Sequence, residues 1–230
     1  MKSLKQVFYR QLNCWSVVGY FMIFVLLACL PIRVARYGSI IQFILCLLFA
    51  VLLLWANNKE SAESDAARKF TAFRKKKNFS LKLVIKSIAW GLLILGMEVV
   101  VLFIIYEMNH VTFYSSNTAR VIQTIKQYPF YVLYTIAVAP VLEELVFRKS
   151  LYSVLYKWLP LWRHLTIKMI VASLITAFMF ALMHNDNSLI DYIVISLYLE
   201  VLYLHYQDIR VSIIAHLTFN VVTLGILLLI

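Results

Sequence analysis

Long apolar runs recur along the whole chain and are separated by polar stretches. The runs cover residues 12–30, 38–56, 83–106, 129–149, 168–184, 189–206 and 211–230. A membrane-crossing α-helix needs about 20 apolar residues, and each run is close to that length. The pattern predicts an all-α, polytopic transmembrane helix bundle of about seven spans, within a range of six to eight.

The composition agrees with a lipid environment. Hydrophobic residues make up 63% of the 230 residues and charged residues 14%, whereas about a quarter of a soluble domain is charged. The first run is long and lacks a small-residue cleavage pattern, so we expect it to remain as an uncleaved span. Three cysteines inside apolar runs are expected to be buried thiols (Cys14, Cys29 and Cys46).

The distribution of charge predicts the orientation in the membrane. The net charge is +11, and basic residues gather in residues 57–82, 148–168 and 207–210, between the runs. Loops rich in Lys and Arg face the cytoplasm, which predicts a cytoplasmic N-terminus, a basic cytoplasmic loop at 57–82 and contact with anionic lipid, with no role for nucleic acid. Three phenylalanines within that loop fit either an interfacial helix or a solvated tether (Phe70, Phe73 and Phe79).

Two adjacent carboxylates interrupt the fourth run, at Glu143 and Glu144. A charged residue in a span costs about 2.5–3.5 kcal/mol on insertion scales, so it requires an explanation. Glu144 and Arg148 share a helix face and can form an ion pair. Glu143 points about 100° away, which leaves it available as a general base. The alternative is that both glutamates bond to neighbouring helices or lie at the interface.

Two later runs add imidazoles and an amide. Phe180 and His184 lie one turn apart, as do His216 and Asn220. Such groups can stabilise an oxyanion or ligate a metal. An interfacial histidine and helix-to-helix hydrogen bonds are the simpler alternatives. Together with Glu143, these residues favour amide hydrolysis.

The three pairs also form an ordered set of motifs. Glu-Glu-xxx-Arg at 143–148, Phe-xxx-His at 180–184 and His-xxx-Asn at 216–220 follow one another along the chain. The sequence resembles the CPBP intramembrane proteases, which include the type II CAAX prenyl proteases and the bacteriocin-processing or immunity (Abi) proteins. The resemblance covers about residues 128–225. It implies one integral membrane unit with N-terminal transmembrane helices in residues 1–127 and a catalytic core in residues 128–230.

The resemblance also implies roles for individual residues. Glu143 would activate the attacking water together with His184, while His216 and Asn220 would support the oxyanion. The site would be braced by three further side chains (Glu144, Arg148 and Phe180).

Whether a metal takes part stays open at this stage. If a divalent metal such as zinc is used, its ligands would be Glu143, His184 and His216. The chain has no His-Glu-xx-His helix, and a metal-free, glutamate-activated water is favoured, so no cofactor is assigned.

The implied activity is that of an intramembrane endopeptidase in a bacterial cell membrane. Its substrate would be a hydrophobic or membrane-associated peptide or protein, in peptide processing or bacteriocin self-immunity. One alternative is a non-proteolytic scaffold or immunity protein that binds a membrane-protein partner. A small transporter with a proton relay of Glu and His is less favoured, because the chain shows no internal repeat.

Some features of the later runs have no assigned role. The sixth run carries bulky residues where the family often has small ones (Tyr198, Leu199, Glu200 and Tyr203), which predicts a different packing of this helix. Glu98, Asp191 and Glu200 are intramembrane acids without a predicted function.

The simple run boundaries also create a conflict of depth. They place His184 about 10 Å from Glu143 along the membrane normal. Either the fourth helix continues through Leu151 and Leu155, or the fifth helix is tilted or begins later.

Overall fold

The protein is an all-α helical bundle. The computed structural model describes residues 4–28, 37–63, 80–109, 115–160, 164–186 and 188–229, and these residues contain helices and no strand. Five of the described helices are long and apolar enough to cross a membrane. They are α3 (Gly38–Glu63), α4 (Leu81–Asn109), α9 (Leu165–Met183), α10 (Leu189–Tyr206) and α11 (Ile209–Leu229). The first helix, α1 (Leu4–Ala28), has a shorter apolar stretch at Gln11–Leu27, and the polytopic helical prediction is confirmed.

The fourth predicted run is one composite helix of successive segments. These are α6 (Tyr131–Leu133), η2 (Tyr134–Val138), α7 (Ala139–Glu143), η3 (Glu144–Leu151) and α8 (Tyr152–Trp158). The helix therefore continues through Leu151 and Leu155, well past the predicted end at residue 149. Glu143 consequently lies near the middle of the composite helix, which removes the conflict of depth.

Two segments of this helix, η2 and η3, have the wider π-helical turn. A π-turn joins residues five apart and occurs often at functional sites. Pro140 is the second residue of α7, just after the first of these segments, and proline cannot donate the backbone hydrogen bond of a regular helix. The backbone is thus irregular on both sides of Glu143.

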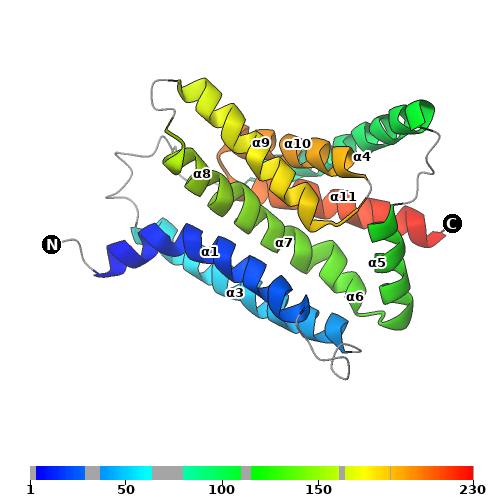
Figure 1. Ribbon diagram of the computed structural model, residues 1–230, viewed down its shortest axis with the longest axis horizontal. Coiled ribbons are helices and arrows are strands. Elements are labelled where there is room, and N and C mark those ends of the chain that lie inside the picture. The colour runs from blue at the N-terminus through cyan, green and yellow to red at the C-terminus, as the bar shows by residue number, and fades with distance from the viewer. Residues whose placement is uncertain are drawn as a thin grey trace.

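An additional helix, α5 (Ser116–Gln127), occupies what the run pattern left as a loop between residues 107 and 128. Ser115 caps its first turn by accepting a hydrogen bond from the Thr118 amide. Ile122 and Ile125 are buried on one face. The run pattern did not predict this helix, because it is too short and too polar to be a span. It lies across one end of the bundle (Figure 1).

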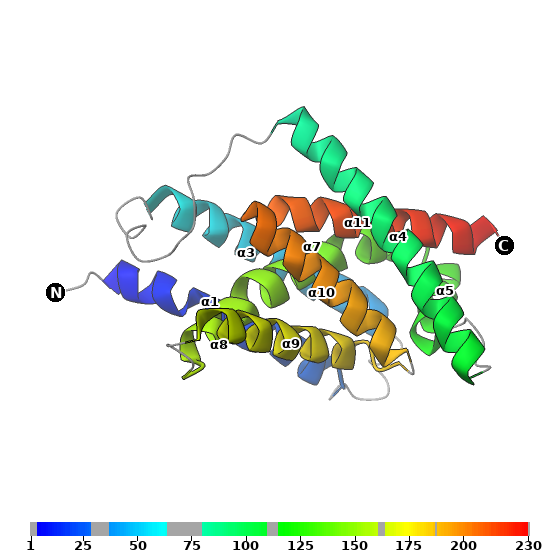
Figure 2. The same ribbon diagram turned by 90° about the horizontal axis from the view of Figure 1, so that it is seen from above.

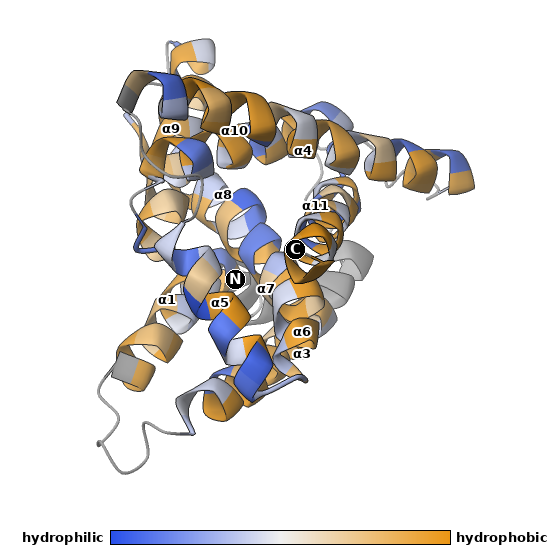
Figure 3. Ribbon diagram, turned by 90° about the vertical axis from the view of Figure 1, so that its right-hand side faces the viewer, coloured by the Kyte–Doolittle hydropathy of each residue, from blue (hydrophilic) through white to orange (hydrophobic). Residues whose placement is uncertain are grey.

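The composite helix lies at the centre of the bundle. Helices α1 and α3 run side by side against it, and α9, α10 and α11 lie on its other sides (Figures 1 and 2). Apolar residues cover the outside of the helices as well as the inside (Figure 3), as a lipid-facing surface requires. The start of α1 and the end of α11 lie at opposite ends of the bundle, which is compatible with an odd number of spans.

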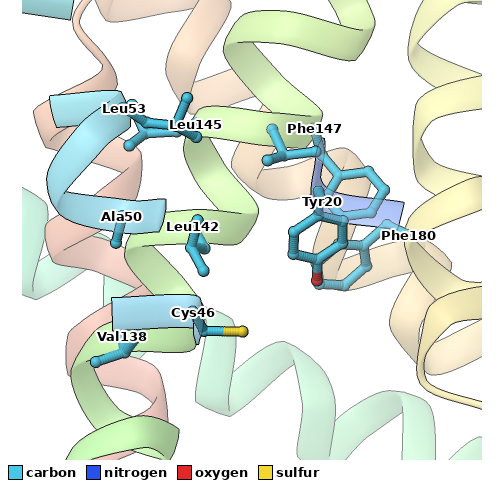
Figure 4. Close-up of a cluster of buried hydrophobic side chains, with 10 residues drawn as sticks. Tyr20, Cys46, Ala50, Leu53, Val138, Leu142, Leu145, Phe147 and Phe180 are labelled. Carbon is cyan, nitrogen blue, oxygen red and sulfur yellow. The ribbon is translucent and has the colours of Figure 1, made fainter. Parts of the chain in front are cut away.

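A buried cluster joins the first half of the chain to the composite helix (Figure 4). The Tyr20 ring on α1 lies 5.6 Å from Phe147, edge to face, and Phe147 lies 5.3 Å from Phe180 on α9 in the same geometry. Cys46 of α3 is fully buried in the cluster, whereas Cys14 is half-buried, and both are free thiols. Most of the basic loop lies outside the described residues, and so do four residues discussed above (Cys29, Phe70, Phe73 and Phe79).

Helices α4 and α11 pack backbone to backbone at Gly91. A Cβ atom added there would lie 2.5 Å from the Ala215 carbonyl oxygen and 2.7 Å from Thr218 Cβ. Small residues allow such close helix approach in membranes. The contact point is next to His216, so Gly91 sets the distance of α4 from a motif residue.

We predict that Gly91→Ala destabilises the fold, because its methyl group would be forced against the backbone of α11. The expected loss is about 1–3 kcal/mol, measured as a lower midpoint of thermal unfolding of the full chain in detergent, followed by tryptophan fluorescence. Gly96→Ala in the same helix is the matched control, since a Cβ there meets nothing within 4 Å. Equal midpoints for the two variants would contradict this packing.

Candidate active site

A fully buried ion pair lies at the centre of the site. Arg148 Nε is 3.5 Å from Glu144 Oε2, and both side chains have 0% exposure. The guanidinium also donates to the Ser196 carbonyl oxygen at 3.4 Å and lies 4.4 Å from the centre of the Phe180 ring. The pairing expected from the four-residue spacing is therefore present, and the charge of Arg148 also contacts α9 and α10.

His216 lies between the two adjacent carboxylates. Its Nδ1 is 3.0 Å from Glu144 Oε1, and its Nε2 is 3.8 Å from Glu143 Oε2. A carboxylate can only accept, so Nδ1–H is the donor in the contact with Glu144. Of these groups, the Glu143 side chain is the most open, with 14% exposure against 5% for His216 and 0% for Glu144.

The irregular helix explains how consecutive glutamates reach one imidazole. Glu143 ends α7 and Glu144 begins the π-helical segment η3. His216 projects from the second turn of α11 between the two carboxylates. Glu143 thus has a partner on another helix, which spacing within its own helix does not reveal.

His184 joins the same cluster through Phe180. It caps the end of α9, and its Nδ1 lies 2.9 Å from the Phe180 carbonyl oxygen. The Phe180 ring centre is 4.6 Å from the imidazole of His184 and 6.3 Å from that of His216. The Phe-xxx-His motif therefore provides a ring against which both histidines pack.

Asn220 satisfies a backbone carbonyl that the composite helix leaves without a partner. In η2 the Ala139 amide donates to the Tyr134 carbonyl, five residues back. The next donor in this register would be Pro140, which has no N–H. Asn220 Nδ2 donates to the Thr135 carbonyl instead, at 2.9 Å. One amide N–H thus forms the helix-to-helix bond considered from the sequence, and a carboxamide has a second N–H to offer.

The candidate metal ligands do not form a ready metal site. Among the described residues, no three His, Cys, Asp or Glu side chains are grouped so that they could hold a metal ion. Glu143 and His216 are close together, but His184 directs Nδ1 to a carbonyl and packs on rings.

The bulky residues of α10 are mostly buried. Leu199, Glu200 and Tyr203 have exposures of 0%, 1% and 7%, and the Tyr198 hydroxyl donates to the Trp90 carbonyl oxygen on α4 at 3.4 Å. Asp191 on the same helix is also buried, at 5%. These side chains fill the space between α10 and its neighbours, where the family resemblance implied small residues.

Sequence reasoning missed the residues that surround His184. Tyr192 stacks on its imidazole with ring centres 4.0 Å apart, and Arg120 of α5 donates to its backbone carbonyl at 3.4 Å. These contacts join distant segments and follow no spacing rule. A short amphipathic stretch at 116–127 was the one signal that could have pointed to them.

Comparisons with known proteins give a family model and bacterial relatives that this chain resembles. The family model of the type II CAAX prenyl endopeptidase Rce1-like domain matches residues 125–222, which include all three motifs. YdiL of Bacillus subtilis (strain 168), whose name describes it as a membrane peptidase, is 27% identical over 183 residues, covering 79% of this chain and 68% of YdiL. The membrane-embedded CAAX protease MroQ of Staphylococcus aureus (strain USA300) is 28% identical over 107 residues, covering 46% of this chain and 42% of MroQ. No solved structure gives a significant match.

The fold, the grouping of the motif side chains and the matched residues lead to one assignment. The chain is a membrane-embedded peptidase, and its residues 125–222 match the family model of the Rce1-like CAAX prenyl endopeptidases.

Proposed function

We propose that this peptidase is a glutamate-dependent endopeptidase that cleaves an amide bond within or next to the bilayer. The observation that supports it most is the row of Glu143, His216 and Glu144, in which a mostly buried but still accessible carboxylate faces an imidazole that Glu144 holds in place. A carboxylate and an imidazole that share one water are suited to general acid–base hydrolysis.

The attacking water would lie between Glu143 and His216. Their facing atoms are 3.8 Å apart, so both can be about 2.8 Å from one water oxygen. Glu143 takes a proton from the water as its oxygen bonds to the scissile carbonyl carbon, and the carbonyl electron pair moves to oxygen. Protonated Glu143 then gives that proton to the amide nitrogen as the C–N bond breaks.

The remaining motif residues would support this step. Glu144 holds the Nδ1–H of His216, which leaves Nε2 to orient the water. The second N–H of Asn220 can donate to the oxyanion. His184 offers its free Nε2 as a further acceptor for water entering the cluster. The resemblance assigned the water to Glu143 and His184, and the 3.8 Å contact of Glu143 with His216 Nε2 supports a share for His216.

The substrate is proposed to be a hydrophobic or membrane-associated peptide or protein. The site lies on membrane-crossing helices, and the relatives are bacterial proteins with peptidase names. We infer a bacterial cell membrane with a cytoplasmic N-terminus, supported by the basic segments between the spans. A substrate of this kind fits a role in peptide processing, including the processing of peptides in bacteriocin self-immunity.

We predict that Glu143→Gln abolishes cleavage, lowering its rate by about 10²–10⁴-fold, because the amide cannot accept the proton of water. The measurement compares membrane proteins and secreted peptides of cells that carry wild type or variant at equal protein levels. Glu107→Gln is the matched control, since Glu107 is an exposed carboxylate on α4. Identical fragments with wild type and Glu143→Gln, together with a phenotype on deletion, would favour the non-proteolytic scaffold.

We predict that Arg148→Met costs about 3–5 kcal/mol of stability, because it leaves the Glu144 carboxylate buried and unpaired. Cleavage should fall by about 10–100-fold in the fraction that folds, since His216 loses its fixed partner. Thermal unfolding in detergent and cleavage by the purified protein test both effects. Lys157→Met, at an exposed position of the same composite helix, should change neither quantity, and wild-type behaviour of Arg148→Met would refute the bracing role.

We predict that cleavage by the purified full chain persists after treatment with EDTA or 1,10-phenanthroline, because the described donors do not form a three-ligand group. The rate before and after chelation is the measurement, with a zinc peptidase treated in parallel as the positive control. If the chelator abolishes cleavage and added zinc restores it, a metal takes part in the reaction.

A further inference from the structure

Helix α5 fixes the backbone at His184. The helix α9 ends at this residue, and Asn185 then adopts a left-handed conformation with φ 45° as the chain turns towards α10. The last carbonyls of a helix have no partner within the helix. Arg120 of α5 donates to the carbonyl oxygens of His184 and Asn185, at 3.4 Å and 2.9 Å. A cation also stabilises this end of the helix electrostatically.

The imidazole of His184 is restricted in a second way. A carbonyl oxygen only accepts, so the 2.9 Å contact with Phe180 places the proton on Nδ1 and leaves the lone pair on Nε2. The Tyr192 ring lies 4.0 Å from the imidazole, with 22° between the planes. Rotation of the imidazole would break both the hydrogen bond and the stacking contact.

Tyr192 is itself held from two sides. Its hydroxyl donates to Asp186 Oδ2 at 3.3 Å and accepts from Asn117 Nδ2 at 3.2 Å. Asp186 in turn accepts from the amide and the hydroxyl of Ser116, both at 3.1 Å. One connected network of hydrogen bonds therefore surrounds the Tyr192 ring. It joins the first turn of α5, the turn after α9 and the first turn of α10.

We propose that Tyr192 is a positioning residue for His184, and that α5 holds it in place through Asn117. Tyr192 keeps the imidazole in the Nδ1–H tautomer with Nε2 directed to the cluster. The catalytic consequence rests on the proposed function, whereas the tautomer of His184 does not. If the network only stabilised the turn after α9, the tautomer of His184 would not depend on the aromatic ring of Tyr192.

The test follows the imidazole directly by NMR of the full chain in detergent micelles. Histidine is labelled with ¹⁵N, and the signals of His184 are identified by their absence in His184→Gln. Tyr192→Phe retains the ring but loses both hydrogen bonds of the hydroxyl, so it should shift the signal only partly towards the average of the two tautomers, whereas Tyr192→Leu should give the fully averaged signal. Asn117→Ala, which removes one hydrogen bond to the tyrosine hydroxyl, should give a smaller change and provides a milder variant if Tyr192→Leu does not fold.

Cleavage of the peptide found in the comparison with Glu143→Gln gives the second readout. Tyr192→Leu should lower kcat by about tenfold, the effect of losing an aromatic contact, with KM within about twofold. Tyr192→Phe, which keeps the aromatic ring, should retain most of the wild-type kcat. Lys126→Gln, at an exposed position of α5, is the matched control and should match wild type in both measurements.

The two readouts separate this proposal from the proposed function. An unchanged His184 signal in both Tyr192→Leu and Asn117→Ala would overturn the positioning role, as would a changed signal with an unchanged kcat. If no peptide is cleaved by wild type while the tautomer still depends on Tyr192, the endopeptidase proposal fails and the network stands as a structural anchor of His184.

Discussion

The buried positive charge of Arg148 determines the arrangement of the site. Arg148 is fully buried on a helix in the centre of the bundle, where an unpaired charge would be very costly. Glu144 compensates it, and the same carboxylate uses its other oxygen to hold His216. The guanidinium lies on Phe180, against which both histidines pack. The positions of Glu144, the two imidazoles and the Phe180 ring thus all depend on neutralising this charge.

The backbone of the composite helix is equally important. Its irregular turn before Pro140 leaves a carbonyl oxygen that can accept a hydrogen bond from another helix. Pro140 cannot donate to the carbonyl that precedes it by five residues, and Thr135 is left with a free acceptor. Asn220 fills that position and so fixes α11 against the helix that carries the glutamates. A residue with an expected chemical role therefore has a structural one as well, and the two uses are compatible because its amide has two N–H groups.

The sequence allowed the parts of this structure that depend on local spacing to be predicted. Apolar runs identified the spans, and the four-residue spacing identified the pair of Glu144 and Arg148. The partner of Glu143 could not be predicted, since it depends on how α11 approaches a π-helical turn. Helix α5 was missed because burial of Ile122 and Ile125 against other helices, rather than its own composition, stabilises it. The end of the fourth helix was placed too early because Arg148 and Lys149 read as loop residues, although Arg148 is paired within the bundle.

The distribution of the site over the chain has a consequence for biosynthesis. The glutamates, His184 and His216 lie on three different helices, and α11 is the last of them along the chain. A ribosome makes the N-terminal helices first, so a partly inserted chain has Glu143 and His184 in the membrane before the imidazole that faces Glu143. The cluster is incomplete until α11 inserts beside α4 at Gly91. Insertion of the final helix is therefore the step that completes the cluster of motif side chains.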